Sequence, residues 1–431
     1  MANGELQRLK KQAHSPFVQE VISWLFITSQ HVGFPTLVAW LFMQFRSNAR
    51  FAQLRWPFLA YLLYAFGIDQ SNESGGKPWP WLQNHPIWQG YKNYFPGKTI
   101  LDFTKQELES KFGYRFDKNE EGTPILFDKN GERKLFVIGM HPHGIISHAS
   151  VANWFIKPNP MEWLGDISIG TIDLNVMFPF WREVMLWMGS IRVNKKGIFA
   201  ALDKGKHVGI IVGGAEEAVE TKPGNGLQNL KLKDRKGFVK VALSRGAALI
   251  PSYNFGETEL YEELVANPPG SMVREVQTFL KGIFGYTLPL FRGRWNSGYP
   301  FRVPLLSVVR SSNFIERRAN FLRVLRFHIS SGYDRLDFNF SKHISTELNF
   351  RFMFLFVITN LKQVGKPIDL PKIEIPTQDE IDRYHGQYVT ALEELYHRYN
   401  FIFSGHILKI VYLGQHTFSK LNFIKRFGSY I

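Results

Sequence analysis

Two apolar runs lie close together near the start of the chain. The first covers residues 18–43 and is interrupted by polar side chains between positions 19 and 31, whereas the second, residues 56–68, carries no charge. A straight membrane span needs about 20 apolar residues, so neither run is long enough alone. We therefore predict a hydrophobic membrane hairpin over residues 1–70, with a buried core helix plus an amphipathic helix as the alternative. Three arginines between the runs favour a re-entrant hairpin over a crossing one.

From about residue 75 the pattern changes to short apolar runs that alternate with helical segments. Residues 135–140, 207–212 and 248–251 are rich in strand-forming side chains and are bounded by turn residues. An amphipathic segment, Gly237–Arg245, precedes the third run and ends at Gly246. This alternation predicts an α/β fold, with a mixed sheet and crossover helices.

A loop with candidate chemistry follows each of the three predicted strands. The loops are HPHG at 141–144, GGAEE at 213–217 and NFGE at 254–257. In open α/β sheets, ligands bind in the crevice outside the carboxyl ends of the strands. We therefore expect the three loops to meet at one site.

Two phenylalanine-rich segments break the α/β pattern. Residues 310–360 contain nine Phe, eight basic and four acidic residues, and residues 401–431 contain five Phe, four basic and no acidic residues. We divide the chain into the hairpin (1–70), an α/β domain (75–309), an unpatterned insertion (310–360), the C-terminal part of the domain (361–403) and an unpatterned tail (404–431).

Composition narrows the classes of function. The 52 Lys and Arg exceed the 37 Asp and Glu by 15, and more than half of this excess lies in the two unpatterned segments. A basic chain suits nucleic acid, an anionic membrane or a phosphorylated ligand, but the sequence has no zinc-finger spacing or basic-region heptads, so we expect no nucleic acid. The absence of cysteine excludes disulfide scaffolds, thiol catalysis and cysteine-based zinc sites. The 38 Phe, 11 Trp and 16 Tyr favour lipid contact or an aromatic core.

The HPHG segment is the best candidate for catalysis. Pro142 restricts its own backbone and that of His141, and an imidazole held rigidly near neutral pH suits a general base. A zinc site needs further ligands, and His148 is the only other histidine nearby, so we expect no metal. A lone loop histidine is more often structural, which leaves that alternative open.

The other two loops offer anion contacts. Gly213 and Gly214 let backbone N–H groups approach an anion or a developing oxyanion, and Glu217 is placed to orient a histidine. Arg235, Lys236 and Lys240 suit phosphate groups, with a solvated helix face as the alternative of equal weight.

Taken in order, these blocks resemble the acyl-CoA:diacylglycerol acyltransferase type 2 family, which includes monoacylglycerol and wax-alcohol acyltransferases. The matching residues are HPHG at 141–144; Tyr94, Phe95 and Pro96; Pro179, Arg182 and Glu183; Gly213, Gly214 and Glu217; Arg235, Gly237, Phe238, Lys240, Ala242, Gly246, Pro251, Phe255, Gly256 and Glu257; and closing blocks at 364–368 and 376–385.

The resemblance implies a glycerolipid acyltransferase-like fold and transfer of a fatty acyl group from acyl-CoA to diacylglycerol. A 2-monoacylglycerol or a fatty alcohol is the alternative acceptor, and a non-catalytic lipid-droplet or membrane protein is the more distant alternative. Acyl-CoA is then a co-substrate, and no cofactor is expected. The implied location is the endoplasmic reticulum membrane with the catalytic domain in the cytosol, or the lipid droplet, and a homo-oligomer is an open alternative.

The resemblance also implies roles for individual residues. His143 is the expected general base, Glu217 its orienting acid, and His141 a support for the loop. The expected substrate-binding residues are Gly144, Gly213, Gly214, Arg182, Arg235, Lys240, Phe255, Gly256 and Glu257.

We expect the two unpatterned segments to have no counterpart in the family. We interpret residues 310–360 and 404–431 as translated intron or mis-spliced sequence, an interpretation that transcript sequencing across residues 309–362 tests.

Overall fold

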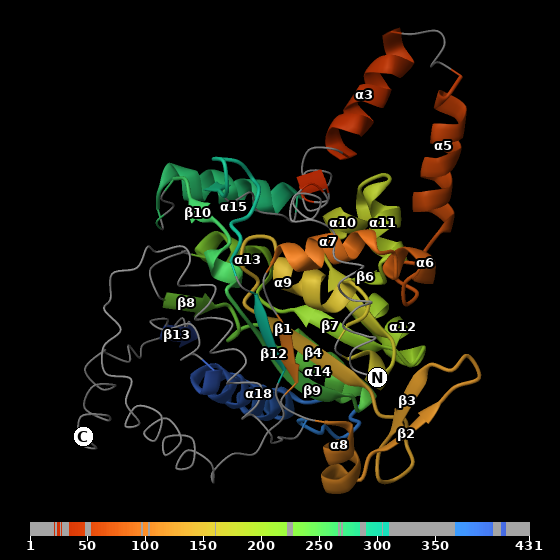
Figure 1. Ribbon diagram of the computed structural model, residues 1–431, viewed down its shortest axis with the longest axis vertical. Helices are drawn as coiled ribbons and strands as arrows, with labels where there is room; N and C mark the ends of the chain where they lie inside the picture. Colours follow the sequence, from red (N-terminus) through yellow and green to blue (C-terminus); the bar gives the residue numbers. More distant parts are fainter. Residues whose placement is uncertain are drawn as a thin grey trace, which may run out of the picture.

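A computed structural model describes most of the chain (Figure 1). The described residues are Val21, Trp24, Leu25 and Ile27, together with 34–47, 53–95, 98–101, 104–159, 161–221, 227–265, 268, 270–284, 290–303, 305–309, 367–399 and 407–410. The predicted insertion, residues 310–360, lies entirely outside the described residues. The predicted tail, residues 404–431, also lies outside them except for 407–410.

Seven strands of the described residues form one mixed sheet in the order β1-β12-β9-β4-β7-β5-β6. All neighbours are parallel except β12 and β9. The strands are β1 (Lys98–Leu101), β4 (Phe136–His141), β5 (Ile167–Thr171), β6 (Ser190–Arg192), β7 (His207–Ile211), β9 (Ala248–Phe255) and β12 (Leu306–Val309). The three predicted strands are therefore confirmed as β4, β7 and β9, and β9 continues four residues beyond its predicted end.

Alternation along the strands divides the core into two layers. In β4, Val137 packs into one layer, whereas Phe136 and Ile138 pack into the other, as the two-residue period of a strand requires. The first layer is closed by α12 (Lys195–Asp203), α14 (Gly237–Arg245) and α18 (Gln378–Tyr399). The second is closed by α7 (Ile87–Tyr94), α8 (Lys105–Phe112), α9 (His148–Ser150), η3 (Val151–Phe155) and η4 (Glu162–Leu164).

Helix α14 has the predicted bounds. Its buried face carries Phe238, Val239 and Ala242, which pack into the first layer. It ends because Gly246 adopts a left-handed conformation with φ of 64°, which glycine tolerates at a helix C-terminus.

Smaller elements surround the sheet. The helices are α6 (Pro80–Gln83), α10 (Asp173–Met177), α11 (Trp181–Trp187), α13 (Gly214–Glu220), η5 (Glu257–Glu259) and α15 (Met272–Phe284). Three two-stranded pairs join β2 (Arg115–Lys118) to β3 (Pro124–Phe127), β10 (Glu262–Glu263) to β11 (Phe291–Arg292), and β8 (Leu227–Leu230) to β13 (Ile407–Ile410). The last pair connects part of the predicted tail to the domain.

Two helices near the N-terminus stand out from the body in Figure 1. They are α3 (Phe34–Ser47) and α5 (Arg55–Leu63), and α5 continues as the π-helix η2 (Tyr64–Ile68). The two helices touch through Phe45 and Phe58, whose ring centroids are 5.6 Å apart, and Tyr61 stacks on Phe180 at the base. None of the described helices has both the length and the apolar content needed to cross a bilayer.

Candidate active site

The three loops predicted to carry chemistry meet at one edge of the sheet. Strands β9, β4 and β7 are adjacent and parallel, so their carboxyl ends lie side by side. HPHG begins at the last residue of β4, the paired glycines follow β7, and Gly256 follows β9. The prediction of a shared edge is confirmed, and the contacts below show how the loops hold one another.

His143 presents a nitrogen lone pair suited to a base. Its Nδ1 lies 3.0 Å from the carbonyl oxygen of Gly144, and because a carbonyl only accepts, Nδ1 carries the hydrogen. The lone pair is therefore on Nε2. Burial lowers the pKa of His143, which keeps the imidazole neutral and able to accept a proton at neutral pH.

Glu217 contacts the main chain of the HPHG loop and not the imidazole expected from the sequence. Its Oε1 accepts the N–H of His143 at 2.5 Å, and its Oε2 accepts the N–H of Lys231 at 2.9 Å. The side chain is 1% exposed, and burial raises its pKa to about 7. Glu217 thus fixes the main chain at His143, while the carbonyl of Gly144 orients the imidazole ring.

The paired glycines have different surroundings. A Cβ at Gly213 would overlap the carboxylate of Glu217, so Gly213 is what allows this acid to lie against the strand end. Gly214 has a φ of 60° and open space where a Cβ would stand. Of the two glycines expected to contact an anion, only Gly214 has open space beside its Cα.

Glu257 holds the other end of the same loop. Its two carboxylate oxygens accept the N–H groups of His148 at 2.8 Å and Ala149 at 2.6 Å, and burial raises its pKa to about 8. Gly144, with φ of 59°, packs so closely that a Cβ there would lie 2.6 Å from Cγ of Glu257. Gly256, with φ of 88°, makes the turn that brings Glu257 into place.

Phe255 lies in the core. It is 3% exposed and stacks on Tyr396 of α18 with ring centroids 5.7 Å apart. Phe255, Gly256 and Glu257 were expected to bind substrate, and the structure places all three in contacts within the protein.

His141 is fully buried beneath the loop. Its Nε2 lies 2.9 Å from the hydroxyl oxygen of Tyr388 on α18, and burial lowers its pKa to about 3. Gly139 makes room for this contact, because a Cβ there would overlap the Tyr388 hydroxyl. A buried, neutral His141 fits the supporting role expected from the sequence.

Tyr388 was not predicted as a site residue. It belongs to the buried face of α18, where Ile381, Leu392 and Leu395 recur at helical spacing. That spacing indicates burial, and it gives no sign that the hydroxyl is directed at a histidine 247 residues earlier.

His148 is a structural histidine. Its two ring nitrogens each lie 2.6 Å from a tyrosine hydroxyl, Nδ1 from Tyr91 and Nε2 from Tyr261. Both nitrogens are therefore used within the core. Across the described part of the chain, no group of three or more His, Asp or Glu is arranged to hold a metal ion.

Arg182 was expected to contact phosphates, and the structure places it inside the protein. Its guanidinium is 1% exposed and donates to Asp69 Oδ2 at 3.2 Å, the Asp69 carbonyl at 2.7 Å and Glu183 Oε1 at 3.0 Å. It lines a cavity of about 500 Å³ between η2 and α11, whose other walls include Tyr61 and Phe180. With two carboxylates around it, its charge is already balanced.

Arg235 and Lys240 remain at the surface. Arg235 reaches Glu216 of α13 at 2.8 Å, which places this cation close to the helix that follows the paired glycines. Lys240 is an exposed residue of α14. Among the expected cations, these two are accessible to an anionic substrate.

Comparison with known proteins identifies one family of acyltransferases. The chain matches the family described as "Diacylglycerol acyltransferase" over residues 127–320 and 355–408, which is more than half of its length. It is 31% identical to "Diacylglycerol O-acyltransferase 2" of Dictyostelium discoideum, over 79% of this chain and 81% of the relative. It is 29% identical to "Diacylglycerol O-acyltransferase 2A" of Umbelopsis ramanniana, over 81% and 79%. It is 33% identical to "2-acylglycerol O-acyltransferase 1" of Bos taurus, over 58% and 70%. No solved structure matches the chain.

Proposed function

The chain belongs to the diacylglycerol acyltransferase family, and from this we propose that it transfers a fatty acyl group from acyl-CoA to diacylglycerol to make triacylglycerol. The observation that supports this best is the Nε2 lone pair of His143 on a loop held at both ends by buried acids. Two of the relatives described above carry the name of this activity.

His143 acts as the general base in this proposal. Nε2 accepts the proton of the acceptor hydroxyl while the oxygen attacks the thioester carbonyl carbon. The tetrahedral intermediate then expels the thiolate of CoA, which takes the proton from the imidazolium. Base catalysis of this kind contributes roughly 10²- to 10⁴-fold in rate.

A 2-monoacylglycerol is the second candidate acceptor. The bovine relative is named for that activity and is 33% identical to this chain. Radiolabelled oleoyl-CoA offered with diacylglycerol, 2-monoacylglycerol or a fatty alcohol in parallel separates the acceptors, and failure with all three contradicts an acyltransferase.

The anionic part of CoA is assigned to the exposed cations. Arg235 beside α13 and Lys240 on α14 are the accessible residues of the expected set. Replacing either by Gln is expected to raise the KM for acyl-CoA more than it lowers kcat.

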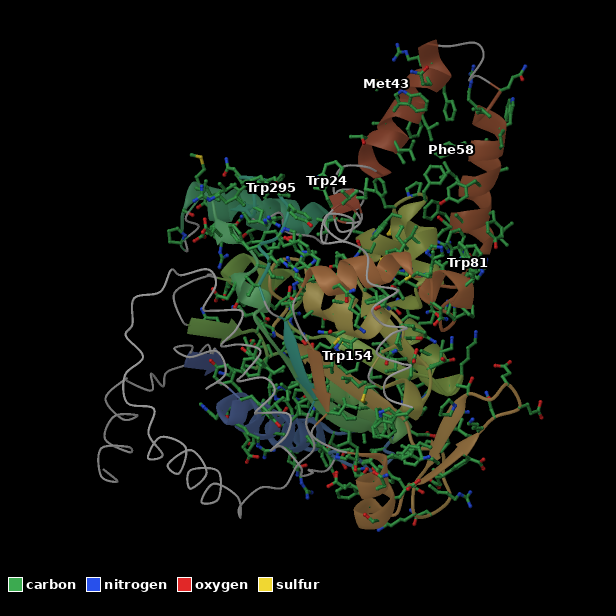
Figure 2. The ribbon with its side chains drawn as sticks, viewed as in Figure 1. Trp24, Met43, Phe58, Trp81, Trp154 and Trp295 are labelled. Carbon is green, nitrogen blue, oxygen red and sulfur yellow. The ribbon has the colours of Figure 1, made fainter. Side chains whose placement is uncertain are left out.

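The proposal includes a membrane location, either the endoplasmic reticulum with the catalytic domain in the cytosol or the lipid droplet. Its support is the apolar surface of the N-terminal helices, where Phe42, Met43, Trp56 and Leu63 are exposed. The large apolar side chains of α3 and α5 are visible in Figure 2, with Met43 and Phe58 labelled.

The test of the catalytic assignment is His143→Ala in microsomes. We expect acyl transfer to be lost while the protein stays with the membrane fraction, because His143 lies on the loop and not on the N-terminal helices. His85→Ala, in the turn between α6 and α7, is the matched control. Full activity of the His143 variant contradicts the assignment.

A further inference from the structure

Helix α15 presents its apolar side outward. Met272, Val276 and Phe279 follow the i, i+4, i+7 spacing of one helix face, and they are 80%, 52% and 67% exposed. The polar Gln277 is 4% exposed. This arrangement is the reverse of a water-facing helix, in which the apolar stripe packs on the core.

The inward side of α15 is attached to the site by charged contacts. Arg274 Nη2 lies 3.1 Å from Glu220 Oε1 at the end of α13, and the same oxygen is 2.9 Å from Lys231 Nζ. The main-chain N–H of Lys231 in turn donates to Glu217. The helix is therefore fixed by its polar side next to the catalytic loop.

The apolar surface continues on both flanks of α15. Leu264 and Val265 before the helix, and Leu290 and Trp295 after it, are exposed. Residues 264–302 contain five basic residues and one acidic residue, and two of the five, Arg274 and Arg292, pair with Glu220 and Glu262, which leaves an excess of two cations. Exposed apolar side chains with tryptophan and an excess of cations complement an anionic lipid surface, where tryptophan lies at the headgroup level.

The position of α15 in the molecule agrees with such a surface. In Figure 1, α15 lies at the same end as α9 and α13, which follow the carboxyl ends of β4 and β7, and α3 and α5 project from that end. Helix α8 and the β2–β3 pair lie at the opposite end. Figure 2 shows Trp295 at this same end of the molecule.

We propose that α15 is an interfacial helix that lies flat on a phospholipid leaflet containing anionic lipid, with Met272, Val276 and Phe279 inserted. Such helices bury their apolar face roughly 5–10 Å into the headgroup boundary. The contact places the carboxyl edge of the sheet against the lipid, so that an acylglycerol reaches His143 without crossing water. This last consequence rests on the proposed acyl transfer, whereas the lipid contact itself does not.

The test uses the natural absence of cysteine. Phe279→Cys in the full chain is labelled with an environment-sensitive fluorophore and reconstituted into vesicles of phosphatidylcholine and phosphatidylserine. Thr278→Cys is the matched control, because Thr278 is exposed, directly precedes Phe279 in the same helix and lies off the apolar stripe. We expect a blue shift and quenching by lipids spin-labelled near the headgroup for position 279 only, both weakened when phosphatidylserine is omitted.

Two results overturn the proposal. One is equal, water-like emission from both positions in vesicles. The other is a blue shift at position 279 that lipid spin labels do not quench, since this means that protein covers the face, either another segment of the chain or a second copy. Repeating the measurement with His143→Ala separates the lipid contact from catalysis, because the quenching is expected to persist in the inactive variant.

Discussion

Replacing Glu217 by Gln tests whether a buried acid holds the catalytic loop in place. The carboxylate accepts two main-chain N–H groups, from His143 at 2.5 Å and from Lys231 at 2.9 Å. A glutamine amide has one oxygen, so one of these N–H groups must face the amide NH₂. The change keeps the size of the side chain and removes one acceptor.

The magnitude follows from that lost acceptor. Leaving a buried donor unpaired costs about 1–3 kcal/mol. If this cost destabilises the conformation in which His143 is positioned to accept the proton, the rate drops by about 5- to 150-fold, at 1.4 kcal/mol for each factor of ten. The loss is expected in kcat with little change in the KM for acyl-CoA, because Glu217 is buried and has no access to CoA.

The assay is acyl transfer from radiolabelled oleoyl-CoA to diacylglycerol in microsomes with matched amounts of protein. Glu216→Gln is the control, since this neighbour is 42% exposed and its pair with Arg235 is a surface ion pair worth about 0–1 kcal/mol. Its kcat is expected to fall by less than about fivefold, the factor that 1 kcal/mol represents. A Glu217→Gln variant with wild-type kcat refutes the reasoning.

Three further outcomes follow from the contacts around the loop. Tyr388→Phe removes the partner of His141 Nε2 and should destabilise the fold by about 1–3 kcal/mol. Gly139→Ala should be worse because its Cβ overlaps the Tyr388 hydroxyl. Thermal unfolding of the double variant should show part of that stability restored. The pKa of Glu257 is raised from 4.5 to about 8, so the folded state binds the proton more tightly than the unfolded state and stability falls as pH rises through this window; Glu257→Gln should flatten that slope in unfolding measured between pH 5 and 8, and an unchanged slope contradicts it. Arg182→Lys keeps the charge but not the planar contacts with Asp69, so it should lower the melting temperature and leave the KM for acyl-CoA unchanged; a selective rise in that KM indicates a phosphate contact instead.

The strands and the meeting of the loops were accessible from sequence because both depend on local pattern. Short apolar runs bounded by turn residues identified β4, β7 and the first half of β9, and parallel strands necessarily end at one edge. The amphipathic period identified α14 with its correct bounds, since Gly246 terminates the helix.

The partners of the site side chains were less accessible. Pattern indicates which residues are buried, but it does not indicate which atom a buried acid contacts, so Glu217 was expected at the imidazole and lies at the main chain. Arg182 was assigned to phosphates because an arginine in a motif carries no sign of the carboxylates that surround it after folding. Tyr388 was missed because its contact joins residues 247 positions apart.

Two acids that follow β7 and β9, the strands on either side of β4, position the HPHG loop. Glu217 holds the loop where His143 begins, and Glu257 holds it at His148 and Ala149, so the catalytic segment is fixed at both ends by groups that substrate does not reach. The motif acids therefore determine geometry, and the proposed function leaves anion binding to exposed cations such as Arg235. This separation has a kinetic consequence, because changes in the acids should lower kcat whereas changes in the exposed cations should raise the KM for acyl-CoA.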